Sequence, residues 1–208
     1  MTKVLLIGDS ISLDYGKYLP RFLPENILVY DKPSDEDAYV DLDTPLGGNG
    51  GDSSMVLDFL RTADQQTLSC DWFFFNCGLH DIKHDRTTDA IQIPLENYKQ
   101  NLEQILALMV EKGIKTVFIN STPTSTLRHS KVKIFYRLEE DVPVYNKAAE
   151  EVMAAHNIPV IDLYSFTKAL NLEEEELFRD HTHFTRPVMQ LHAAFLAGYL
   201  NAGCHPVM

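Results

Sequence analysis

The clearest indication of the fold is a stretch near the amino terminus, Val4-Leu5-Leu6-Ile7-Gly8-Asp9-Ser10. Four apolar residues end abruptly in a glycine, an aspartate and a serine, as a buried parallel strand ends in a turn. The same pattern recurs in four later segments, each a short apolar run bounded by polar or turn residues: 27–30, 72–76, 116–120 and 159–162. The sequence therefore predicts five short buried strands.

Helical patterns lie between these strands. The clearest covers 95–112, where one face carries apolar residues at helical spacing, namely Tyr98, Leu102, Ile105, Leu106 and Met109. Two more helices are predicted, from Asp141 to about Asn157 and from about Pro187 to Leu200. Because parallel strands need crossover connections, this alternation predicts an α/β fold, a flavodoxin-like three-layer α/β/α sandwich around a five-stranded parallel sheet. With no linker or composition shift, residues 1–208 are expected to form a single domain.

Composition narrows the classes of function. A formal charge of −12 repels phosphate backbones, so nucleic acid is not an expected partner. No apolar run reaches the about 18 residues of a membrane helix, and the start of the chain lacks a signal-peptide pattern, which predicts a cytoplasmic protein. Cys70, Cys77 and Cys204 lack the spacing of a disulfide framework, so we expect reduced thiols. The sequence makes no prediction of the oligomeric state.

Polar residues cluster just after the predicted strands. Ligands of parallel sheets gather beyond the carboxyl ends of the strands, so these residues are expected to converge on one rim. The segments concerned are Gly8-Asp9-Ser10, Gly51-Asp52-Ser53, Gly78-Leu79-His80-Asp81 and, before the last helix, Asp180-His181-Thr182-His183. Two long connections, 31–51 and 122–140, are expected to overhang this rim.

Ser10, His183 and Asp180 supply the three roles of a serine hydrolase. A serine hydroxyl is a weak nucleophile unless a base takes its proton, and that base needs a third group to fix its tautomer. The three-residue step from Asp180 to His183 lets the carboxylate reach Nδ1 while Nε2 faces the serine. This chemistry predicts an acyl-enzyme intermediate and requires no cofactor.

Four segments together resemble the sequence blocks of the SGNH (GDSL) hydrolases. Gly8-Asp9-Ser10-Ile11-Ser12 matches the first block and Asp180-x-x-His183 the last, while segments 51–53 and 78–81 resemble the glycine block and the Gly-x-Asn-Asp block between them. The blocks follow the family's order and span most of the chain. The Gly-x-Ser-x-Gly elbow of the α/β-hydrolases is absent from the sequence.

The resemblance implies an oxyanion hole formed by the amides of Ser10 and Gly51, with Gly50 as the alternative glycine, and by a side chain of the third block. The family's asparagine is replaced here by His80, which can donate one hydrogen bond from Nε2. We hypothesise that His80 is such a donor and that Asp81 or a nearby acceptor sets its tautomer. Asp81 is thus a supporting residue, as is Asp9 of the first block.

Two other classes of function stay open. The first is a metal-dependent hydrolase, because mixed nitrogen and oxygen ligands can hold zinc or manganese; the candidate ligands are His80, Asp81, His84, Asp85, Asp180, His181 and His183. The second is a non-catalytic carbohydrate-binding relative. Since no zinc-protease pattern is present, no metal is expected.

The resemblance implies an ester substrate, and the expected one is a short-chain ester, with O-acetyl groups on a carbohydrate favoured. Segment 122–140 interleaves cations with aromatic rings: Arg128, His129, Lys131, Lys133 and Arg137 with Phe135 and Tyr136. This pattern is more often a solvated loop or an oligomer contact. If it binds substrate, an anionic or sugar ligand fits it better than a long-chain lipid.

Overall fold

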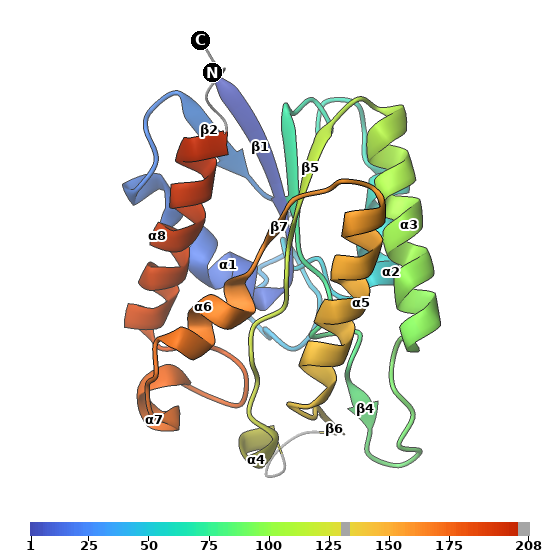
Figure 1. Ribbon diagram of the computed structural model, residues 1–208, viewed down its shortest axis with the longest axis vertical. Coiled ribbons are helices and arrows are strands. Elements are labelled where there is room, and N and C mark those ends of the chain that lie inside the picture. The colour runs from blue at the N-terminus through green and yellow to red at the C-terminus, as the bar shows by residue number, and fades with distance from the viewer. Residues whose placement is uncertain (130–133, 204–208) are drawn as a thin grey trace.

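A computed structural model, which describes residues 1–129 and 134–203, contains the expected five-stranded sheet (Figure 1). All five strands are parallel and run in the order β2-β1-β3-β5-β7. Their bounds are Thr2–Ile7 (β1), Ile27–Tyr30 (β2), Trp72–Phe75 (β3), Lys115–Ile119 (β5) and Val160–Ile161 (β7). The prediction of a five-stranded parallel α/β sheet is confirmed.

The central strands are apolar on both faces because helices cover both sides of the sheet. Residues 4–7 of β1 are at most 6% exposed, and residues 73–75 of β3 at most 4%. The last strand is shorter than expected. It ends at Ile161 because Asp162 caps the next helix, accepting a hydrogen bond from the amide of Ser165.

Helices form the two outer layers, as Figure 1 shows. One layer holds α1 (Ser10–Gly16) and α8 (Arg186–Gly203), with the short helices η1 (Leu19–Arg21), α6 (Leu163–Ala169) and α7 (Glu174–Leu177) beside them. The other holds α2 (Ser53–Thr62), α3 (Leu95–Glu111) and α5 (Asp141–Ala155). The apolar face predicted for α3 is confirmed, since its five apolar residues are at most 1% exposed.

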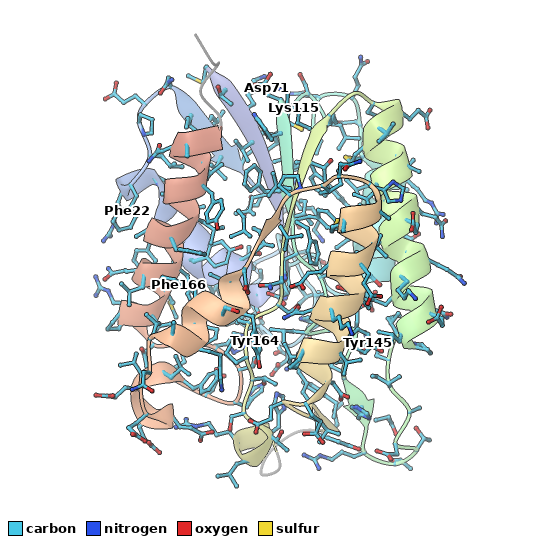
Figure 2. The ribbon with its side chains drawn as sticks, viewed as in Figure 1. Phe22, Asp71, Lys115, Tyr145, Tyr164 and Phe166 are labelled. Atoms are coloured by element: carbon cyan, nitrogen blue, oxygen red, sulfur yellow. The ribbon has the colours of Figure 1, made fainter. Side chains whose placement is uncertain are left out.

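A small second sheet lies beyond the carboxyl ends of the main strands. It pairs β4 (His84–Asp85) with β6 (Phe135–Tyr136) in antiparallel register, and α4 (Thr126–His129) lies at the same end of the molecule (Figure 1). Asp71 and Lys115 mark the opposite end, near the amino terminus (Figure 2). None of the helices in the described part of the chain is long and apolar enough to cross a membrane.

Candidate active site

Ser10 is the first residue of α1, directly after the turn that ends β1. Asp9 caps the helix, with its Oδ1 accepting a hydrogen bond from the amide of Ile11 at 2.9 Å. The turn requires a glycine at position 8, because a Cβ there would lie 2.6 Å from the Oγ of Ser12. Strand, turn and cap together fix the Ser10 hydroxyl at the carboxyl edge of the sheet.

Asp180 and His183 lie in a tight loop before α8. Oδ1 of Asp180 accepts hydrogen bonds from the amides of Thr182 (3.0 Å) and His183 (2.8 Å), which fixes the carboxylate relative to the ring. Nδ1 of His183 is 2.8 Å from Oδ2 of Asp180, and Nε2 is 2.7 Å from Oγ of Ser10. The structure thus brings the three predicted residues into one line of hydrogen bonds.

Electrostatics favour an ionised Asp180. Burial alone would raise the pKa of this carboxyl, but hydrogen bonds from His183 and from the amide of Thr182 hold its pKa well below the usual range. An ionised carboxylate facing Nδ1 keeps the hydrogen on that nitrogen, so Nε2 presents its lone pair to the Ser10 hydroxyl. The arrangement can therefore take a proton from Ser10.

His80 follows β3 and is 1% exposed. Burial, reinforced by the charges of Lys83 and Arg137, holds the pKa of this ring well below its usual value, so the ring is neutral. Its Nδ1 is buried, and none of the described residues forms a hydrogen bond with it. Because an unpaired N–H is more costly to bury than an unpaired lone pair, the hydrogen is expected on Nε2.

Asp81 does not set the His80 tautomer. Both of its carboxylate oxygens face the amide of Ser53 at the start of α2, at 3.0 and 3.1 Å, and Nδ1 of His80 has no acceptor. Burial raises the pKa of Asp81 to about 7, against the hydrogen bonds from Ser53. Asp81 thus anchors the helix that follows the glycine segment, which corrects the expected contact with His80.

In the glycine segment, the φ of Gly51 is +71°, in the left-handed region that favours glycine. Its amide donates to Oδ1 of Asn49 at 3.0 Å, whereas the amide of Gly50 donates to the carbonyl of Gly8 at 2.7 Å. The Gly50 bond ties this segment to the turn that carries Ser10. The Gly51 bond, to a side chain, is the easier of the two to exchange for a ligand.

Asp9 supports the site as a helix cap. Burial raises the pKa of this carboxyl, although the bond from Ile11 and the charge of Arg137 oppose that effect. Its Oδ2 is buried without a hydrogen-bond partner.

A cavity of about 710 Å³ opens beside His183. Both long connections line it as expected, the first through residues 39–43 and the second through Leu127 and Arg128. Its remaining lining residues are Glu174, Glu175, Asp180, His181 and His183. A second cavity, of about 800 Å³, shares Asp41 and Asp43 with the first and extends toward β4 and Phe135.

Comparison with known proteins agrees with this geometry. The model of the GDSL-like lipase/acylhydrolase family matches residues 6–191. The chain belongs to this family. No curated protein matches the chain at the significance we required.

Solved structures of this fold include several esterases. A lipase/acylhydrolase from Enterococcus faecalis is 24% identical, with a TM-score of 0.70 over 97% of this chain and 96% of its own. An acetylxylan esterase from Geobacillus stearothermophilus is 16% identical (TM-score 0.68; 97% and 94% covered), and the acetyl xylan esterase AlAXEase is 13% identical (TM-score 0.69; 95% and 99% covered). At these identities the likeness establishes the fold.

The metal ligands suggested by the sequence do not come together as one set. His84 lies in β4, and its Nε2 is 2.8 Å from Oδ2 of Asp141. Oδ1 of Asp85 accepts hydrogen bonds from the backbone amides of the residues two and three positions later in the chain. Within the described ranges, one group brings its donor atoms within 4.8 Å: Asp180, His181 and His183. Both ring nitrogens of His183 already face Asp180 and Ser10, so these residues fit a hydrogen-bonded triad better than a metal centre.

The basic segment also differs from expectation. Arg137 is 1% exposed, its Nε donates to the carbonyl of Leu79, and its guanidinium lies 5.1 Å from the ring centre of Phe135. His129 is fully buried beside it, while Lys131 and Lys133 lie outside the described residues. Arg137 and His129 are thus buried, whereas Arg128 lines the cavity; the sequence pattern indicates the cluster of cations but not their burial.

Proposed function

We propose that this protein is a serine carboxylic-ester hydrolase in which Ser10 is the nucleophile, His183 the general base and Asp180 the group that orients His183. One observation carries the proposal: the unbroken line of hydrogen bonds from Asp180 through His183 to Ser10. Membership of the acylhydrolase family supports the same chemistry.

In the proposed reaction, Oγ of Ser10 attacks the ester carbonyl carbon while Nε2 of His183 takes the hydroxyl proton. The tetrahedral intermediate collapses by breaking the bond to the alcohol oxygen, which receives that proton from His183. Water then attacks the acyl-enzyme, again losing a proton to His183, and the acid leaves as Ser10 regains its hydrogen. No cofactor is needed.

Three donors would stabilise the oxyanion: the amide of Ser10, the amide of Gly51 and Nε2–H of His80. Gly51 is preferred to Gly50 because its amide is bonded to a side chain, whereas the bond from Gly50 to the Gly8 carbonyl holds the turn itself. A neutral ring with hydrogen on Nε2 suits His80 to the role of the family's asparagine.

A short acyl group on a neutral sugar is the substrate we propose. Ser10 is only 4% exposed, which favours a small acyl group such as acetyl. Acidic side chains outnumber cations around the cavity, and Arg128, the basic segment's contribution, is paired with Glu174 at 3.4 Å. This lining disfavours the anionic ligand considered from the sequence and leaves the sugar. Two neighbours of the same fold are acetylxylan esterases.

Hydrolysis of para-nitrophenyl esters from acetate to octanoate tests the proposal. We expect activity highest on acetate, unchanged by EDTA and abolished in Ser10→Ala. Ser12→Ala is the matched control, because the Ser12 hydroxyl lies in the same helix but donates to the Asp9 carbonyl at 2.7 Å. Activity in Ser10→Ala equal to wild type would refute the serine mechanism.

Treatment with EDTA distinguishes the serine mechanism from a metal-dependent one. The metal-dependent alternative is tested because Asp180, His181 and His183 lie close together. Loss of activity in EDTA, restored by zinc or manganese and indifferent to Ser10, would establish that alternative. A folded protein inactive on every ester, and on acetylated xylan, would instead indicate a binding protein.

A further inference from the structure

His181 stands between two carboxylates. Its Nε2 is 3.0 Å from Oδ1 of Asp43, and its Nδ1 is 3.6 Å from Oδ1 of Asp180. The side chains of His181 and Asp43 are only 11% and 10% exposed, so water screens their interaction weakly. A second histidine–carboxylate pair, His181 with Asp43, therefore adjoins the first, and both histidines face Asp180.

The backbone of His181 adds a third attachment. Its carbonyl accepts hydrogen bonds from the amide of Ser125 (3.2 Å) and the hydroxyl of Thr124 (3.1 Å), and its ring meets that of His129 edge-on at 4.3 Å. One residue thus joins the loop before α8, the long connection 31–51 and the segment that begins α4.

Asp43 is where connection 31–51 crosses the site. Its carbonyl accepts a hydrogen bond from Nζ of Lys83 at 2.7 Å, so the backbone of Asp43 is held as well as its side chain. Asp41 and Asp43 border both cavities, so this stretch of chain is their common wall. The position of Asp43 therefore sets the shape of the space in which a substrate would lie.

We propose that His181 is a positioning residue that docks connection 31–51 through Asp43 and steadies Asp180 through the contact with its Oδ1. This inference rests on the proposed function. The Asp43 contact shapes the substrate site and acts on KM, whereas the Asp180 contact acts on the orientation of His183 and so on kcat.

Two amide replacements separate the contacts. The amide nitrogen of glutamine stands near the position of ring Nε2, and that of asparagine near Nδ1. His181→Gln therefore retains the Asp43 contact and loses the Asp180 contact, while His181→Asn does the reverse. His156→Asn is the control. His156 also pairs with a carboxylate, that of Glu103, but both side chains are exposed to solvent, in the helical layer that contains α3 and α5.

The measurements are kcat and KM on para-nitrophenyl acetate, and hydrogen exchange of amides 37–46 in the substrate-free proteins. For His181→Asn, which loses the hydrogen bond to Asp43, we expect KM and the exchange rate to rise about tenfold. This is the usual effect of losing one charge-assisted hydrogen bond, and kcat should change little. For His181→Gln we expect kcat to fall roughly threefold, because the lost contact is long, with KM and exchange unchanged. His156→Asn should match wild type.

The inference is overturned if the two variants change the same parameter to the same extent, or if neither alters exchange of the connection. Exchange needs no activity, so it tests the docking even if Ser10→Ala shows that the proposed mechanism is wrong. If Ser10 proves essential while exchange stays at the wild-type rate in both variants, the mechanism stands and the role of His181 fails.

Discussion

On the base side of the proposed site, Asp180 and His183 are three residues apart and oriented by bonds within one loop, whereas the proposed oxyanion side is assembled from separate segments. Gly51 comes from the end of a long connection and His80 from the turn that follows β3. The Gly51 amide is held by Asn49, and Nδ1 of His80 has no partner.

The difference indicates which part of the proposed site has its reactive geometry in the substrate-free protein. The base side already has the geometry that proton transfer needs. On the proposed oxyanion side, the Gly51 amide would have to exchange Asn49 for the substrate. Substitutions on the base side should therefore affect turnover most, and substitutions on the oxyanion side should give smaller effects.

The largest effect in this comparison is expected from Asp180→Asn. An asparagine amide facing Nδ1 would favour the wrong tautomer of His183, and comparable triads lose about 10⁴ in turnover. The measurement is kcat on para-nitrophenyl acetate, with Asp58→Asn on the surface of α2 as control. A loss below tenfold would mean that Asp180 does not orient the base.

Removal of the third oxyanion donor should cost less. His80→Ala is expected to lower kcat about 10²–10³-fold, the usual cost of one such donor, and His80→Asn to restore part of the loss. Because the buried ring is neutral, kcat should show no added titration from His80 between pH 6 and 8. Unchanged activity in His80→Ala, or higher activity in His80→Asn, would refute this role.

Gly51→Ala tests the backbone on the same side. A residue with a side chain at φ +71° costs about 1–2 kcal/mol, and its Cβ would lie 2.9 Å from Cβ of Pro45. Urea denaturation should show at least this loss of unfolding free energy. Gly198→Ala in α8 is the control, where a Cβ meets nothing within 4 Å and stability should rise slightly. Equal stability of the two variants would contradict the strain argument.

The smallest effect is a pH dependence at Asp81. Its pKa is about 7 in the folded protein against 3.8 for the free side chain, so the folded state binds more protons between these values. Its contribution to stability is therefore present at low pH and is lost as pH rises through about 7. Relative to wild type, Asp81→Asn should gain melting temperature at pH 8 compared with pH 5. An equal difference at both values would contradict a protonated Asp81.

Much of the fold could be predicted because its signals are local. Buried parallel strands are short apolar runs, and α3 repeats its apolar residues along one face, so both depend on neighbours in sequence. The small sheet of β4 and β6 was not predicted, because each strand has only two residues and the paired residues are about fifty positions apart in the sequence. No periodicity exists in so short a strand.

Within the site, the amino-acid sequence was sufficient to predict the turn of Gly8, Asp9 and Ser10 and the proximity of Asp180 to His183. Residues so few positions apart are held close together by the local backbone conformation. Tertiary packing alone decided that the Asp81 carboxylate accepts a hydrogen bond from the Ser53 amide and that Arg137 is buried, with Nε donating to the Leu79 carbonyl. It also decided that His181 meets Asp43, 138 residues away in sequence. Such contacts depend on how layers and long connections pack, and packing leaves no local pattern in the chain.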